Sequence, residues 1–346
     1  MKRLILTAIS CLLGLPASLL AAKPLVIAHR GASGYLPEHT LESAAYAHAL
    51  GADYIEQDVV MSRDGTLVVL HDIHLETTTD VAARFPDRKR PDGSFYALDF
   101  TWEELRSLRV SERFDPKTGA AVFPRRFPVA AGAFRLCTLE EQIALIAGLN
   151  RATGRTTGLY VEFKDPAFHK KEGRDLGAAL LEVLGRHGYH DPADRIFVQC
   201  FDPVALKRLR TELRTRLPLV QLLGDNAWGE SPADYNALRT PAGLKEIATY
   251  AQGIGPHLGQ IVSGRAADGK PQLTSLVSDA HREGLLVHPY TFRADTLPAG
   301  IPDIARLLEL FLVQAGIDGF FIDQPDAGVR AVNALPLKTE GNHRKR

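Results

Sequence analysis

Two carboxylates two residues apart, and two histidines that each end an apolar run, are the groups in this sequence best suited to chemistry. Glu56 and Asp58 lie in YIEQDVV, a run typical of a buried strand, while His29 and His71 follow LVIA and TLVVL. Alternate residues of a strand point to the same face, so Glu56 and Asp58 project together. Such a pair suits a divalent cation better than a hydrophobic core.

A third carboxylate in a later strand-like run extends this group. Glu162 lies in GLYVEFK, where Tyr160, Glu162 and Lys164 alternate onto one face. A single glutamate in a strand is usually a surface residue, but three carboxylates from two buried strands favour a common site. Oxygen ligands of this kind are typical of Ca²⁺, Mg²⁺ or Mn²⁺. Without a cation the three groups would repel one another, and their pKa values would rise.

The two histidines are candidates for the general acid and base, because imidazole titrates near neutral pH. A structural role is the alternative for either histidine alone. Arg30 and Lys164 place positive charge beside the carboxylates, which suits a phosphate anion bound with the metal. An ion pair with those carboxylates is the alternative for both cations. The sequence contains no GxSxG nucleophile elbow and no phosphate-binding P-loop.

The segments that must position these groups predict an α/β fold of the (β/α)8, or TIM-barrel, type. Buried strands alternate with helical segments, and polar residues follow the strands at their carboxyl ends, where barrel sites lie. A doubly wound sheet is the alternative, but the GxGxxG loop that it would need is absent. The strand-like runs, about eight of them in the barrel, are 25–28, 53–60, 66–70, 158–164, 195–202, 217–223, 252–255, 285–291 and 318–323. The main expected helices are 40–50, 138–150, 175–187, 203–213, 241–250, 273–283 and 304–314.

Residues 73–135 interrupt this alternation and are expected to form an insertion after the second βα region. Charged residues, proline and glycine dominate 87–93, and the pattern Thr101 to Glu104 predicts a capped short helix. We expect the insertion to pack over one side of the barrel mouth, since a structureless connection of this length is unusual in a compact domain. A disordered linker is the alternative.

Composition and charge narrow the class of protein. The chain has 346 residues, 45% of them apolar and 24% charged, with zero formal net charge. This length fits one barrel with insertions, or two domains of about 150 residues. Zero net charge argues against nucleic-acid binding, which usually requires a basic surface. Cys137 and Cys200 show no metal-ligand spacing and are expected to be separate buried thiols, although an oxidising compartment would permit a disulfide.

The first 22 residues read as a secretory signal peptide. Two basic residues precede an apolar run at 4–20, and Ala22 marks the expected cleavage site. A membrane anchor is the alternative, but the run is short for a span and contains glycine and proline. We therefore expect an exported protein without stable membrane insertion, with its enzyme domain at 23–335 and a basic tail at 336–346.

With HRG at 29–31, ExD at 56–58 and HD at 71–72, the sequence resembles the glycerophosphodiester phosphodiesterase family, most closely its exported bacterial type. His39 stands where many relatives have Asn, and Cys137 where Pro is common; neither departure is expected to affect the core chemistry. HRG followed by ExD and then HD is a specific combination. The segments that carry the resemblance span nearly the whole mature chain in family order: HRGASGYLPEHT (29–40), YIEQDVVMSRDGTLVVLHD (54–72), VEFK (161–164), VQCFDP (198–203), GIGP (253–256), VHPYTFR (287–293) and GFFIDQPD (319–326).

This resemblance implies a TIM barrel that hydrolyses glycerophosphodiesters, such as glycerophosphocholine and glycerophosphoethanolamine, to sn-glycerol 3-phosphate and an alcohol. It implies that the substrate's own 2-hydroxyl attacks phosphorus, giving a cyclic phosphate that water opens. It also implies a periplasmic location and one divalent cation, Ca²⁺ before Mg²⁺. The residues are assigned as follows: Glu56, Asp58 and Glu162 to the metal; His29 and His71 to acid–base catalysis; Arg30 and Lys164 to phosphate oxygens; Glu38, Gln199, Phe201 and Tyr290 to the pocket.

Two other functions are alternatives. A related barrel phosphodiesterase or lipase acting on intact phospholipids would share the histidines and the metal, but it would expose an apolar rim, whereas this insertion is basic and polar. An exported binding protein or adhesin with an inactive barrel would lack one of the five key residues, and all five are present. The sequence leaves a homodimer open and does not determine the alcohol preference.

Overall fold

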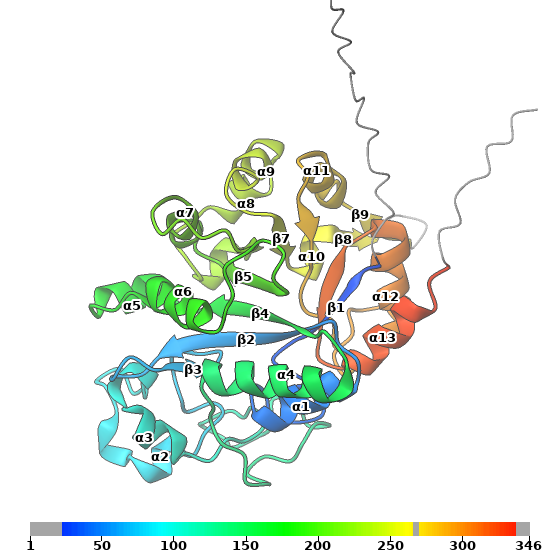
Figure 1. Ribbon diagram of the computed structural model, residues 1–346. Coiled ribbons are helices and arrows are strands. Elements are labelled where there is room, and N and C mark those ends of the chain that lie inside the picture. The colour runs from blue at the N-terminus through cyan, green and yellow to red at the C-terminus, as the bar shows by residue number, and fades with distance from the viewer. Residues whose placement is uncertain (1–22, 266–269, 337–346) are drawn as a thin grey trace, which may run out of the picture.

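The computed structural model describes residues 23–265 and 270–336, and its centre is a barrel of parallel strands. Around the barrel the strands follow their order in the chain, and helices lie outside them (Figure 1). This is the (β/α)8 fold that the sequence predicts. In the described chain the parallel strands are β1 (Leu25–Ala28), β2 (Tyr54–Met61), β4 (Gly158–Phe163), β5 (Ile196–Cys200), β6 (Leu219–Leu223), β7 (Gly253–Pro256), β10 (Leu286–Val287) and β11 (Gly319–Ile322).

The barrel closes between the segment that follows β10 and the last strand, β11. β10 is shorter than the predicted strand at 285–291, because Pro289 has no N–H group to donate to a ladder. The chain nevertheless stays beside β11. The Phe321 N–H donates to the Pro289 carbonyl at 3.0 Å, and the Phe292 N–H donates to the Phe321 carbonyl at 2.8 Å. The eight strands therefore enclose one interior.

Side-chain caps start the helices that cover the barrel. Thr40 accepts the Ser43 N–H at the start of α1, and Thr138 forms a capping box with Glu141 at the start of α4. The larger helices are α1 (Leu41–Ala49), α4 (Leu139–Thr153), α6 (Leu176–Arg186), α7 (Pro203–Thr211), α9 (Pro241–Ile247), α11 (Leu276–Arg282), α12 (Ile304–Glu309), its continuation η4 (Leu310–Ala315), and α13 (Pro325–Asn333). Shorter helices in the loops are α5 (Pro166–Lys171), η3 (Asn226–Trp228), α8 (Tyr235–Leu238) and α10 (Leu258–Ile261).

Apolar side chains fill the barrel from within and seal it from outside. Inside, the rings of Tyr160 and Phe197 stack at 4.9 Å between centroids, and Phe321 meets Tyr160 edge-on. Outside, Val161 and Phe163 pack in the larger cluster beneath the helices. This alternation along β4 directs every second residue inward, so polar residues near the carboxyl ends of the strands line the mouth.

The prediction that 66–70 is a strand of the same kind as the barrel strands is wrong. β3 (Leu67–Val69) pairs antiparallel with β2, with Val60 opposite Val68. The link between them is a tight turn containing Gly65 at φ +89°, and parallel strands need a crossover of a dozen residues or more. The hairpin still serves the site. The Leu70 N–H donates to the Asp58 carbonyl at 2.9 Å, which returns His71 to the level of the carboxylates.

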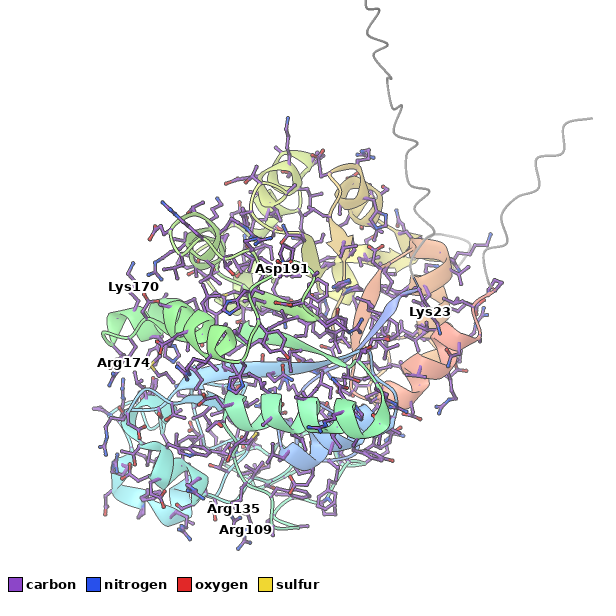
Figure 2. All side chains as sticks on the ribbon, viewed as in Figure 1. Lys23, Arg109, Arg135, Lys170, Arg174 and Asp191 are labelled. Carbon is purple, nitrogen blue, oxygen red and sulfur yellow. The ribbon has the colours of Figure 1, made fainter. Side chains whose placement is uncertain are left out.

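The residues of the predicted insertion are ordered and form a lobe beside β2 and β3 (Figure 1). Their own apolar cluster contains Phe95 and Phe100, both buried. Thr101 and Glu104 form the expected capping box. The surface is basic and polar: Arg109 and Arg135, labelled at the lower edge of Figure 2, are exposed. The helices of the lobe are α2 (Val81–Arg84), η1 (Pro86–Arg88), η2 (Ala97–Asp99) and α3 (Trp102–Arg106).

Three further predictions concern the ends of elements, the cysteines and the membrane. The helix expected from residue 273 begins at 276, because Leu273 belongs to β9 (Pro271–Leu273), which pairs with β8 (Val262–Arg265). Cys137 and Cys200 are both buried and free.

The predicted signal peptide, and all of the basic tail except residue 336, lie outside the described residues. Among the described helices none has the length and apolarity to cross a bilayer.

Glu112→Gln is expected to stabilise the protein at pH 8 and to have little effect near pH 4.5. Glu112 is buried in the insertion, and burial, opposed by the charge of Arg126, raises its pKa to about 8 from 4.5. Between these values the unfolded chain loses a proton that the folded chain keeps, so stability falls as pH rises. We expect a gain of about 1–3 kcal/mol at pH 8 in urea unfolding. Equal urea midpoints for both proteins at pH 8 would contradict this.

Candidate active site

The predicted site residues converge on an open pocket at the carboxyl ends of the barrel strands. The pocket has a volume of about 160 Å³. Asp58 is fully buried behind its lining, and Glu38 is the one predicted pocket residue that does not line it. The other predicted residues all do: His29, Arg30, Glu56, His71, Glu162, Lys164, Gln199, Phe201 and Tyr290.

Glu56, Asp58 and Glu162 form one buried cluster at this pocket. Asp58 on β2 is paired in register with Glu162 on β4, and one oxygen from each of the three carboxylates lies within 4.8 Å of the others. Burial and the charge of Asp58 raise the pKa of Glu56 well above its usual range. Burial, opposed by Lys164, raises the pKa of Glu162 to about 8. A bound cation would relieve this repulsion.

The oxygens of the cluster fit a divalent cation. Asp58 Oδ1 and Gln199 Oε1 are buried and have no hydrogen-bond partner among the described residues. Gln199 Nε2 donates to Glu56 Oε1 at 3.0 Å, which fixes the amide beside the carboxylates. Buried acceptors are rarely left unsatisfied, and a cluster of three carboxylates with two unsatisfied oxygens, one on Asp58 and one on Gln199, suits a hard cation. The described residues thus hold a candidate metal site without identifying the ion.

His39, one of the two departures from the family pattern, lies against this cluster, and the prediction that its identity does not affect the chemistry stays a prediction. His39 Nε2 lies 2.7 Å from Asp58 Oδ2, and both side chains are buried. Burial alone would raise the pKa of Asp58, but the charge of His71 and the hydrogen bond with His39 hold it well below its usual range. Cys137, the other departure, donates its Sγ–H to the His39 carbonyl at 3.2 Å. His39 therefore holds Asp58, a candidate metal ligand, and Cys137 in turn holds the backbone of His39.

His29 is oriented by an aspartate from the far end of the chain. Its Nδ1 lies 2.6 Å from Asp323 Oδ1, so the carboxylate favours a proton on Nδ1 and leaves Nε2 to the pocket. The other oxygen, Asp323 Oδ2, accepts from Arg126 of the insertion at 2.6 Å and from Arg293 at 2.9 Å. Burial and the charge of Arg30 lower the pKa of His29 to about 4, so the ring is neutral at pH 7.

His71 has the same kind of support from its neighbour. Its Nδ1 lies 2.5 Å from Asp72 Oδ1, and Asp72 Oδ2 accepts from Arg113 of the insertion at 2.6 Å and from Thr77 at 2.9 Å. Burial and the charge of Arg30 lower the pKa of His71 to about 3. Each histidine is thus held by an aspartate, and each aspartate is held by an arginine of the insertion.

The two predicted phosphate-binding cations are already paired. Lys164 Nζ donates to Glu162 Oε1 at 2.6 Å and lies 3.5 Å from His71 Nε2. Arg30 donates to Glu38 at 3.1 Å and lies 3.6 Å from Asp58. This geometry is consistent with both roles predicted for Arg30 and Lys164 from the sequence, an ion pair with a carboxylate and the binding of phosphate oxygens. Glu38 accepts hydrogen bonds from both Arg30 and Arg113, the latter at 2.6 Å. It therefore holds Arg30 in the pocket wall and does not line the pocket itself.

A family model of the glycerophosphoryl diester phosphodiesterases matches residues 29–327 of this chain. The chain belongs to this family. It is 41% identical to the glycerophosphodiester phosphodiesterase of Haemophilus influenzae over 330 residues, which covers 90% of each protein. It is 37% identical to the enzyme of that name in Treponema pallidum, covering 90% of this chain and 92% of the relative.

Solved structures of phosphodiesterases share the fold. A glycerophosphoryl diester phosphodiesterase structure from Silicibacter pomeroyi matches with a TM-score of 0.66 at 26% identity, covering 90% of this chain and 95% of the other. A phosphodiesterase from Oleispira antarctica, solved with the product sn-glycerol-3-phosphate, matches with a TM-score of 0.61 at 23% identity, covering 90% and 97%. Family membership confirms the expectation of a phosphodiesterase, and the alternative of an inactive binding protein is not supported.

The phosphodiesterase pocket has supporting and lining residues that sequence reasoning missed, and Asp323, Arg113 and Arg126 are supports that do not line it. Asp323 follows the last barrel strand as a polar residue, the same signal that identified His29. Arg113 and Arg126 lie in irregular chain, where no periodicity marks them. The loop after β6 brings Trp228 and Glu230 to the pocket with no sequence signal at all. Other missed lining residues are Leu222, His257, Thr291, Arg293 and Phe321.

Asp72→Asn is expected to lower kcat of the phosphodiesterase by roughly 10-fold or more, because the amide can hold His71 in the wrong tautomer. Although burial alone would raise the pKa of Asp72, the hydrogen bond from His71 holds it well below its usual range, so the carboxylate is charged at pH 7. Steady-state kinetics with a saturating diester measure the change, and Asp92→Asn, on the exposed surface of the insertion, is the control. An unchanged kcat would show that His71 needs no orienting carboxylate.

Proposed function

We propose that this protein hydrolyses glycerophosphocholine, glycerophosphoethanolamine and similar glycerophosphodiesters to sn-glycerol 3-phosphate and an alcohol. One observation carries the proposal. A buried cluster of three carboxylates shares its pocket with two histidines, and each histidine is held through Nδ1 by its own aspartate. Such a pocket can bind a metal-associated phosphate and move protons on two sides of phosphorus.

The proposed chemistry uses the substrate's own hydroxyl. One histidine accepts the proton of the glycerol 2-hydroxyl at Nε2, and the oxygen attacks phosphorus and forms a cyclic phosphate. The other histidine donates a proton at Nε2 to the departing alkoxide; the roles reverse when water opens the ring. A bound phosphodiester anion raises the pKa values of both histidines, which allows one ring to be protonated. Arg30 and Lys164 hold the phosphate oxygens.

A divalent cation completes the proposed site, Ca²⁺ before Mg²⁺. Glu56, Asp58 and Glu162 would hold it, with the unsatisfied oxygens of Asp58 and Gln199 beside it. When bound, the ion polarises a phosphoryl oxygen and offsets negative charge in the transition state. Three carboxylates and one amide oxygen would form a mixed set of ligands. Such a set suits Ca²⁺, because Ca²⁺ accepts more oxygens and less regular arrangements than Mg²⁺.

We also propose that the protein is exported and acts in the periplasm. The support is the sequence pattern of residues 1–22, with basic residues before an apolar run and small residues after it. The phospholipid-cleaving alternative is not favoured, because the family model and the curated relatives are glycerophosphodiester phosphodiesterases, and the insertion exposes arginines such as Arg109 and Arg135 (Figure 2). We expect no nucleic-acid partner, and a homodimer stays open.

The test is product analysis with purified protein and added Ca²⁺ or Mg²⁺. Glycerophosphocholine and glycerophosphoethanolamine should each yield sn-glycerol 3-phosphate and the free alcohol, while phosphatidylcholine vesicles should yield no water-soluble phosphate. If folded protein releases no sn-glycerol 3-phosphate from either diester with either metal, the proposal is wrong. Cleavage of the vesicles instead would favour the phospholipase alternative.

A further inference from the structure

The pocket is built in two halves from opposite sides of the barrel. The first half carries charged groups on neighbouring strands β1, β2 and β4: His29, Arg30, Glu56 and Glu162. The second half carries rings that follow the neighbouring strands β5, β6, β7 and β10: Phe201, Trp228, His257 and Tyr290. Because the reacting groups lie in the first half, the aromatic half is left for a part of the substrate that does not react.

One carboxylate stands in the aromatic half. Glu230 lines the pocket and is half-buried, and it is not one of the clustered metal ligands. Within residues 23–265 and 270–336, no hydrogen bond or ion pair satisfies it; Lys164, the cation that attracts it most strongly, is already paired with Glu162. Two other pocket cations, Arg30 and Arg293, have carboxylate partners of their own. The Glu230 carboxylate is therefore available to a ligand; burial raises its pKa, and a bound cation would favour its charged form.

Aromatic rings line the same pocket as this carboxylate. The Trp228 side chain is 48% exposed and meets His257 edge-on, with 5.3 Å between ring centroids. The ring centroid of Tyr290 lies 5.8 Å from that of His257 and 5.9 Å from that of Phe201. An exposed indole, with further rings and a carboxylate in the same pocket, can recognise a quaternary or primary ammonium ion through cation–π attraction and charge.

The loop that presents Trp228 and Glu230 is anchored on both sides. Asn226 accepts the Tyr235 N–H at 2.8 Å and donates to Asp234 at 2.9 Å. The buried Tyr235 hydroxyl bonds Ser231 at 2.8 Å, next to Glu230 in the chain. These bonds fix the loop before a ligand arrives, which lowers the entropy cost of binding.

We propose that Trp228 and Glu230 form a subsite for the positively charged alcohol of a glycerophosphodiester, such as choline or ethanolamine. This inference rests on the proposed function, the hydrolysis of glycerophosphodiesters, and adds to it a preference for the charge of the alcohol. Diesters of cationic alcohols are better substrates than diesters of neutral alcohols, because only a cationic alcohol meets the carboxylate and the indole face.

The kinetic test compares two substrates in each variant. Glu230→Gln and Trp228→Ala should lower kcat/KM for glycerophosphocholine by roughly 3- to 10-fold and leave glycerophosphoglycerol within about 2-fold of the wild type. Trp228→Phe should restore most of the loss, since it keeps a ring. Glu283→Gln, in the loop before β10 at the opposite end of the barrel, is the matched control and should change neither value.

A binding test separates this inference from the proposed function. The chain has two tryptophans, so Trp102→Phe leaves Trp228 as the single indole reporter. Choline chloride should change its fluorescence with saturation, and Glu230→Gln in the same background should weaken that binding by roughly 3- to 10-fold. Choline binding without diester hydrolysis would support the subsite and overturn the proposed function.

Three outcomes would overturn the subsite. The first is an equal loss for both diesters in Glu230→Gln, which would mean that Glu230 acts through Lys164 or binds the glycerol. The second is no loss for glycerophosphocholine in either variant. The third is hydrolysis of diesters by a protein whose Trp228 fluorescence does not respond to choline, and this outcome would leave the proposed function intact.

Discussion

Replacing His29 or His71 with glutamine is expected to lower kcat for diester hydrolysis by about 10²- to 10⁴-fold, the usual contribution of general acid–base catalysis. Each histidine is fixed by an aspartate through Nδ1 and offers Nε2 to the pocket, and glutamine has no group that exchanges a proton near neutral pH. Stopped assays of sn-glycerol 3-phosphate release at saturating glycerophosphocholine measure the change in kcat.

The effects of the two histidine substitutions on kcat should not add up in the double variant. If each ring serves as acid in one step and as base in the other, the double variant should be little slower than either single variant. His190→Gln is the control, because His190 is an exposed histidine on the loop after α6. A folded His29→Gln or His71→Gln protein with the kcat of the wild type would rule out that histidine as a proton-transfer group.

Glu162→Gln is expected to abolish the response of the protein to Ca²⁺ and to lower activity by at least about 100-fold, because a bound metal contributes several kcal/mol to phosphoryl transfer. In the wild type, Ca²⁺ well above its dissociation constant should raise the melting temperature by a few degrees, since it binds only the folded state. The variant removes one charge from the cluster but keeps an acceptor for Lys164. Differential scanning fluorimetry with and without EDTA measures the shift.

The control for the metal site is Glu103→Gln, whose side chain is 84% exposed on the insertion. It should show the same Ca²⁺-dependent rise in melting temperature as the wild type. An equal rise in Glu162→Gln would show that the cation binds elsewhere. No rise in the wild type with Ca²⁺, Mg²⁺ or Mn²⁺ would show that the three carboxylates hold no ion of this kind under those conditions.

The carboxylate cluster could be predicted because its members lie in regular strands. The alternation of β2 directs Glu56 and Asp58 to one side, and the same rule applied to β4 brings Glu162 to the neighbouring position. His29 was identifiable for a related reason, since it follows a short apolar strand and such ends meet at the mouth of a barrel. Local periodicity is therefore sufficient where a site is built directly on strands.

The supports of the site could not be predicted, because they depend on long-range packing. Asp323 is 294 positions from His29, and Arg126 lies in irregular chain 197 positions from Asp323. His39, which contacts Asp58, adopts a left-handed backbone conformation at φ +64°, which no sequence pattern predicts for a histidine. β3 was misassigned since its apolar pattern is the same in a hairpin and in a barrel strand, and the tight turn before it was the only local sign.

Release of sn-glycerol 3-phosphate from glycerophosphocholine by EDTA-treated protein, followed as Ca²⁺ is added back, is the most direct test of the central claim. We predict no release after EDTA, a saturable return with Ca²⁺ in the wild type, and no return in His71→Gln. Full-rate release in the presence of EDTA would contradict a metal-dependent site. A Ca²⁺-dependent return of the same size in His71→Gln would contradict the two-histidine mechanism.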